Sequence, residues 1–218
     1  MGFTSAWSIT AHPDPTITAL APHLLPALRS DRERPGARDR WERWQSAPLP
    51  DVRTWHTAPS TPGAPVADPA AIRDFHELTA PGPEVDEVCA GLRDPGFHVY
   101  DDVWNDDLDH EDVFVSVHSK EYAVAALFHA LGPARAALLP GWCGNFLLGA
   151  AEAAAALPAV ERAFAFSVDE RAAAERQDWL WYGVGDDTEE SVLDGPLRVW
   201  RRAVAKGYGL CGVAVHVA

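Results

Sequence analysis

The sequence is poor in cysteine and has no long apolar stretch. Its 218 residues contain Cys89, Cys143 and Cys211, an odd and widely spaced set without a CxxC pair. This pattern argues against a disulfide framework or a cysteine-type zinc site and favours a reducing compartment. No apolar run approaches the roughly 18 residues of a membrane span, and residues 1–15 do not resemble a signal peptide. We therefore expect a cytoplasmic protein without a membrane segment.

Basic residues are outnumbered, 18 against 32 acidic ones, which gives a formal net charge of -14. A chain with this charge repels phosphate backbones, so we expect no nucleic-acid partner. One basic cluster stands out, but acidic residues interleave with it, and we interpret it as the surface of a solvated helix. The cluster consists of Arg29, Arg32, Arg34, Arg38, Arg40 and Arg43.

The sequence also lacks any catalytic or cofactor-binding motif that we can name. The segment GVGD at residues 183–186 is expected to follow a helix and not a strand, so it is no dinucleotide-binding fingerprint. Cys143 matches no cysteine-hydrolase signature, and we expect its thiol to pack in the core. The alternative is a nucleophile with His118 or His129 as its base and Asn145 as the orienting group. We predict no bound cofactor.

Residues 101–112, DDVWNDDLDHED, carry seven carboxylates and no lysine or arginine. Clustered carboxylates suit a hard divalent cation, and Asn105, Asp107 and Asp109 occupy the first three ligand positions of a calcium loop. The pattern then fails, because histidine and serine stand where the loop needs glycine and glutamate. We therefore expect a solvated acidic turn and no bound metal.

What the sequence does contain is a series of strand and helix patterns that predicts one α+β domain over residues 1–218. Period-two alternation predicts strands at residues 2–10, 97–100, 113–118 and 210–218. Helical spacing predicts helices at residues 17–28, 41–44 with its arginine-rich surroundings, 70–79, 84–92, 120–131, 147–157, 167–182 and 194–206. We expect a mainly antiparallel sheet with helices packed chiefly on one face. A long Pro-rich loop at about residues 46–70 should be fixed to the domain by Trp55.

Prolines and capping residues set the expected ends of these helices. Pro22 and Pro26 should restrict the first helix to short turns, and Pro158 should close the helix that starts near residue 147. Ser119 is the expected N-cap of the helix that follows the strand at 113–118. Asp68 should cap the helix at 70–79, and Ser167 with Glu170 forms the S-x-x-E pattern of a capping box.

The carboxyl-terminal half has an order of elements known from one bacterial family. Lys120 and Tyr122 form a K-x-Y pattern in a helix with a late histidine, His129. The next helix carries Leu147, Glu152 and Leu157, and the chain closes with a helix and a strand. In this organisation the segment from about residue 112 onward resembles the YfbM-like family of uncharacterised bacterial proteins. The resemblance implies an α+β architecture and no activity.

The predicted strands differ in residue size between their two faces. The bulky sets are Phe3, Trp7 and Ile9; Val113, Val115 and Val117; and Val213, Val215 and Val217. We expect these sets to share one face that packs on helices, while the small-residue face either meets solvent or walls a ligand cavity. On strand parity, His118 and His216 should project together from the small-residue face, opposite Val115 and Val215.

Two functions from different classes fit these features. The first is a cofactor-independent enzyme in which His118 and His216 perform acid–base chemistry, such as elimination, isomerisation or cyclisation of a largely apolar small molecule. Its expected substrate-binding residues are Ser116, Trp142, Asn145 and Trp104. The second is an acidic protein-binding module of the immunity or antitoxin type, which would mask a basic partner protein. Whether the protein is an enzyme and how it assembles stay open at this point.

Overall fold

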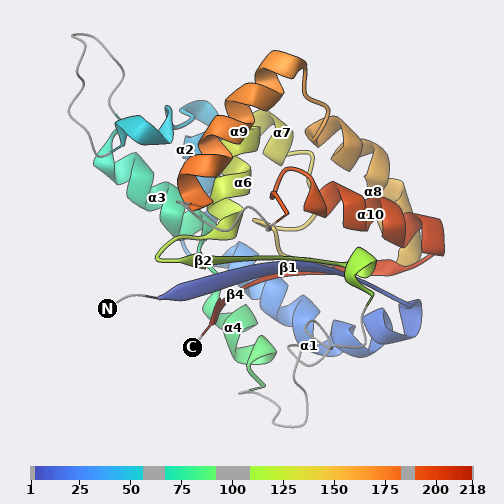
Figure 1. Cartoon of the computed structure of the whole chain (residues 1–218). Helices are drawn as coiled ribbons and strands as arrows, with labels where there is room; N and C mark the ends of the chain where they lie inside the picture. The colour runs from blue at the N-terminus through green and yellow to red at the C-terminus, as the bar shows by residue number, and fades with distance from the viewer. Residues whose placement is uncertain (1–2, 56–66, 92–108, 183–189, 218) are drawn as a thin grey trace.

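A computed structural model describes the chain at residues 3–55, 67–91, 109–182 and 190–217, with the backbone alone described at 178–182. The fold is α+β, as predicted, and is built on a four-stranded antiparallel sheet with strand order β2-β1-β4-β3 (Figure 1). The strands are β1 (Thr4–His12), β2 (Val113–Ser119), β3 (Phe146–Leu148) and β4 (Gly209–Val217). The first and last strands therefore form the centre of the sheet. The strand predicted at 97–100 lies outside the described residues.

Helices lie chiefly on one face of the sheet, and α1 and α4 cover the other face (Figure 1). The helices are α1 (Asp14–Glu33), α2 (Ala37–Ser46), α3 (Pro69–Thr79), α4 (Pro83–Cys89), α6 (Ala123–Leu131), α7 (Pro133–Ala136), α8 (Ala150–Ala163), α9 (Val168–Tyr182) and α10 (Gly195–Lys206). Two 3₁₀ turns, η1 (Val52–Thr54) and η2 (His110–Asp112), complete the described elements.

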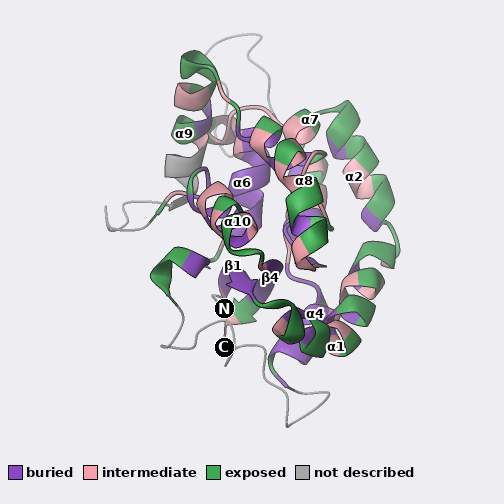
Figure 2. Cartoon of the chain, turned by 90° about the vertical axis from the view of Figure 1, so that its right-hand side faces the viewer, coloured by how far each residue is buried: buried purple, intermediate pink, exposed green. Residues whose placement is uncertain are grey.

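The larger core lies between the sheet and the helices of the more crowded face. Helix α6 is buried nearly all round (Figure 2), because its sequence AVAALFHAL contains no charged residue. The indole of Trp7 donates to the Gly144 carbonyl at 3.0 Å, and that of Trp200 donates to the Ala153 carbonyl at 3.0 Å. Both buried indoles thus keep a hydrogen-bond partner, which removes the cost of burying their N–H groups.

A second core fills the space between the sheet and helices α1 and α4. Leu20 and Leu24 of α1 and Val85 of α4 pack there against Val213 and Val215 of β4. Both faces of the central strands are therefore buried by helices.

The covered second face corrects the expected arrangement of the strand surfaces. Trp7 is paired in register with Ser116 and Ala214, so its side chain lies on the face opposite to Val213 and Val215. We expected the bulky sets to share one face of the sheet, and they do not. With helices on both faces, the central strands β1 and β4 pack on two sides, whereas Val115 and Val117 of β2 remain exposed. Small neighbours on β2 and β4 make room for the large Trp7 ring.

The prolines did not end helices as predicted. Helix α1 runs unbroken for 20 residues with Pro22 and Pro26 inside it, and α8 continues through Pro158. Pro22 and Pro26 are four residues apart and both exposed, so the carbonyls that lose a partner face water. Burial of the opposite side of α1 holds the helix together.

Several capping predictions are confirmed. Asp68 accepts a hydrogen bond from the Ala70 amide at 2.9 Å at the start of α3. Ser167 and Glu170 form a reciprocal capping box at the start of α9. Ser119 is not the cap of α6, because it belongs to β2, and the N-cap of α6 is Tyr122.

Trp55 fixes the Pro-rich loop to the domain, as predicted. Its side chain is buried and packs edge-on against Phe75 and His129 at centroid distances of 6.1 and 5.0 Å. Its indole donates to the Pro50 carbonyl at 3.0 Å. The rest of the loop at residues 56–66 lies outside the described residues.

Candidate functional site: an arginine-lined groove beside the sheet

The strand register confirms that His118 and His216 project from the same face of the sheet. Both are direct partners of Ser5 on β1, which lies between them. Two strand spacings of about 4.8 Å separate their backbones by roughly 10 Å. Their surroundings nevertheless differ: the two imidazoles have different solvent exposure and different hydrogen-bond partners.

His118 is buried, with 4% of its surface exposed, and projects from the sheet toward the helix layer. A hydrogen bond of 3.1 Å joins its Nε2 to the hydroxyl of Ser116, another predicted site residue. Burial lowers the pKa of His118 from 6.5 to about 4, so the ring is neutral at physiological pH. The Ser116 and His118 side chains thus form a hydrogen bond with each other inside the fold.

His216 lies at the far end of β4 and is more accessible, with 40% of its side chain exposed. Its Nδ1 lies 2.8 Å from a carboxylate oxygen of Asp86 on α4, and its backbone amide donates to the other oxygen at 2.9 Å. The rings of Phe3 and Tyr122 stand edge-on to the imidazole at 5.8 and 5.9 Å. This pair has the geometry in which a carboxylate orients a histidine.

Trp142 and Asn145 are brought together by a tight turn. Their backbones exchange two hydrogen bonds of 2.9 Å, and the two residues between them, Cys143 and Gly144, have φ values of 45° and 80°. Positive φ at both central positions is the type I′ hairpin geometry. Asn145 also accepts a hydrogen bond from the Ala214 amide at 2.7 Å, so its side chain caps the edge of β4 beyond β3.

The Cys143 thiol is buried in the core, as predicted. Burial raises its pKa well above the ordinary value for a cysteine. A thiol in this state is a poor nucleophile, and the structure gives no support to the alternative that Cys143 attacks a substrate.

The acidic run is only partly described, and Trp104 and residues 101–108 lie outside the described residues. At its end, Asp112 is buried and accepts from Arg202 at 3.3 Å and from Lys206 of α10. Asp109 accepts from Arg202 at 3.1 Å. Our expectation of a solvated acidic turn is therefore wrong for the carboxyl-terminal end of the run. There, Arg202 and Lys206 of α10 supply the positive charges that the run itself lacks.

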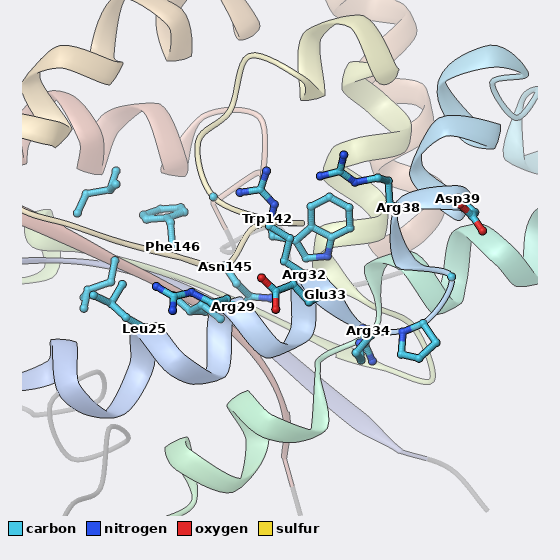
Figure 3. Close-up of a pocket in the computed structure, with 16 residues that line it drawn as sticks. Leu25, Arg29, Arg32, Glu33, Arg34, Arg38, Asp39, Trp142, Asn145 and Phe146 are labelled. Atoms are coloured by element: carbon cyan, nitrogen blue, oxygen red, sulfur yellow. The ribbon is translucent and has the colours of Figure 1, made fainter.

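A groove of about 690 Å³ runs along the β3 edge of the sheet, between α1, the start of α2 and the turn that precedes β3 (Figure 3). Its volume falls in the range of small-molecule sites. Trp142 and Asn145 line this groove, whereas His118, His216 and Ser116 do not. The structure thus divides the predicted site residues between two places.

The charged residues of the groove are mostly cationic. They are Arg29, Arg32, Arg34, Arg38, Glu33 and Asp39. Arg34 lies 3.9 Å from the buried Asp31. Among the described residues, Arg29, Arg32 and Arg38 have no ion pair or hydrogen bond through their guanidinium groups.

Most other arginines of the described chain pair with carboxylates, although a few exposed ones such as Arg73 do not. Arg40 and Arg43, from the same sequence cluster, pair with Asp74 on α3, and Arg171 and Arg198 likewise pair with carboxylates. Most arginines of this cluster are exposed on helices, in agreement with our interpretation of a solvated helix surface. The residues fall on two helices and face two directions. Those that line the groove come from both helices, whereas Arg40 and Arg43 lie on another side of α2 and face α3.

Trp142 forms the wall opposite these arginines. Figure 3 shows Arg32 extending from α1 and Arg38 from α2 toward its ring. The indole Nε1 is shielded from solvent and has no hydrogen-bond partner in the described part of the chain. Helix α2 begins beside it at Gly36, which provides no side-chain cap. Guanidinium groups and a helix N-terminus both attract negative charge, so this end of the groove favours an anion.

Comparison with protein-family models, with characterised proteins and with solved structures finds no match for this chain. The resemblance to the YfbM-like family therefore stays a prediction. In the described residues no helix combines the length and apolarity needed to cross a membrane.

Proposed function

We propose that this protein binds an anionic small molecule in the groove between α1, α2 and Trp142. The proposal is supported chiefly by one observation: three arginines gathered in one groove, Arg29, Arg32 and Arg38, have no carboxylate partner among the described residues, although the chain carries a net charge of -14. With so many carboxylates in the chain, an arginine cluster without partners keeps its hydrogen-bonding capacity for a ligand.

Inorganic phosphate at constant ionic strength tests this proposal. It should raise the melting temperature of the protein, because a ligand that binds only the folded state stabilises it by mass action. The double variant Arg32→Gln/Arg38→Gln should lose this shift and weaken binding by more than about tenfold, since a hydrogen bond to a charged group contributes about 1.5–3 kcal/mol. Calorimetric titration measures the change in affinity.

Arg73→Gln is the matched control, because Arg73 is exposed on α3, has no ion pair in the described residues and lies outside the groove. This variant should keep the full phosphate response. Equal responses in the double variant and in the unmodified protein would place anion binding elsewhere and overturn the proposal.

A second candidate function is acid–base catalysis centred on His216, and the specific observation that favours it is the 2.8 Å contact with Asp86. If Nδ1 donates to Asp86, then Nε2 is left as the basic nitrogen. In this form of the enzyme hypothesis His216 acts as the base and the buried His118 supports the fold. The acidic protein-binding module stays a third possibility, without a contact in the described residues that favours it.

Diethyl pyrocarbonate, which acylates accessible neutral imidazoles, tests the availability of His216. At neutral pH we expect modification of His216 at least tenfold faster than that of His118, because 40% of the His216 side chain is exposed and His118 is buried. Peptide mapping by mass spectrometry measures both rates. Modification of the two residues at equal rates would remove the basis for assigning them different roles.

A further inference from the structure

The groove changes in character along its length. On α1, the residues that line it are Leu25, Leu28, Arg29, Arg32 and Glu33. Their spacing of three and four residues places them on one side of the helix. This side begins with leucines and ends with two arginines and Glu33, so the helix wall is apolar at one end and charged, with a net positive charge, at the other.

The opposite wall changes in the same direction. It runs from Trp142, beside the arginines, through Phe146 to Leu148 on β3. Figure 3 shows Leu25 and Phe146 at one end of the groove, with Trp142, Arg32 and Arg38 toward the other. Two walls from distant parts of the chain thus have their apolar and polar ends aligned.

Leu25 is unusual for this fold, because 44% of its surface is exposed although it is a large apolar residue. An exposed leucine alone needs no explanation. Here it lies in the same groove as three arginines without an ion pair in the described part of the chain. A ligand that covered both would remove apolar surface from water while its charge met the guanidinium groups.

We infer that the ligand is an amphipathic anion, with a carboxylate or phosphate head at Arg32, Arg38 and Trp142 and an apolar tail directed toward Leu25 and Phe146. This inference rests on the proposed anion-binding function and adds the ligand class. Arg32 lies seven positions after Leu25 in α1, which corresponds to about 10 Å of helix. An extended octyl chain has about this length.

Two pairs of probes separate the head from the tail: acetate with octanoate, and inorganic phosphate with octyl phosphate. In each pair we expect the alkyl member to bind at least tenfold more tightly by calorimetric titration, because its tail covers apolar groove surface. Tighter binding of octanoate than of octyl phosphate, or the reverse, identifies the head group as carboxylate or phosphate.

Variants then assign the two ends. Leu25→Ser should reduce the advantage of octanoate over acetate by about threefold or more, with little change in the binding of the head groups. Arg38→Gln should weaken the binding of all four probes. Val168→Ser is the control, since Val168 is the most exposed large apolar residue described, at 86%, and lies outside the groove.

The outcomes distinguish the two proposals. If alkyl probes bind no more tightly than their head groups, while the head groups still depend on Arg38, the ligand class is wrong and anion binding stands. An alkyl advantage that survives Leu25→Ser also overturns the placement of the tail. If none of the four probes binds, the proposed anion-binding function fails, and this inference fails with it.

Discussion

Replacing Gly195 with alanine is expected to lower the free energy of unfolding by about 3 kcal/mol, the upper part of the range for overpacked cores. A Cβ atom at this first residue of α10 would lie 2.0 Å from Cδ2 of Phe114. Phe114 is buried, and its ring already meets Trp7 edge-on at 5.6 Å. The ring cannot move aside without displacing Trp7, so α10 would have to shift away from the sheet.

Urea unfolding measures this effect, with Gly149→Ala as the control. Gly149 also stands at the start of a helix, but its added Cβ would meet no atom closer than 3.8 Å. We therefore expect a change of less than about 1 kcal/mol there, the scale of an N-cap substitution. If Gly195→Ala were as stable as Gly149→Ala, the close packing of α10 on β2 would be contradicted.

Local signals explain why most elements could be predicted from the sequence. The Asp68 cap and the box formed by Ser167 and Glu170 act within a few residues, so the same residues that form the pattern also make the contact. Proline was the weaker local signal. Its effect depends on whether the carbonyl that loses its partner meets water, and exposure of Pro22 is a property of the whole fold.

The faces of the sheet could be predicted only in part. Strand parity correctly placed His118 and His216 on one side, because alternation is a property of the backbone itself. Which side faces helices depends on elements distant in sequence. Helices α1 and α4 cover the valine side of β4, so neither face of that strand is free to be the open wall of a cavity.

The groove could not be predicted because it depends on which charges find partners. Arg38 and Arg40 are two residues apart, yet Arg40 pairs with Asp74 while Arg38 remains unpaired among the described residues. The signal available in the sequence was the helical spacing of Leu25, Leu28, Arg29 and Arg32, which places leucines and arginines on one side of a helix. Closeness in sequence groups all six arginines together and does not show this spacing.

The stability of the protein should fall as the pH is lowered from 7.5 to 5, and His118 should account for about 2 kcal/mol of the decrease. In the unfolded chain this histidine takes up a proton near pH 6.5, whereas burial delays protonation in the fold until about pH 4. Between these pH values the unfolded state binds more protons than the folded state. The free energy of unfolding therefore falls as the pH is lowered. The contribution of the neutral ring is fully present above pH 6.5 and is lost as the pH approaches 4.

Urea unfolding of His118→Gln at several pH values isolates this contribution, because the slope with pH reports proton uptake even if the variant is less stable throughout. We expect the slope to flatten, with a remainder from His129, whose pKa is also lowered by burial. The exposed His110 provides the control, and His110→Gln should keep the slope of the unmodified protein. An unchanged slope in His118→Gln would mean that His118 is hydrated in solution, and would make it available again as the acid–base group of an active site.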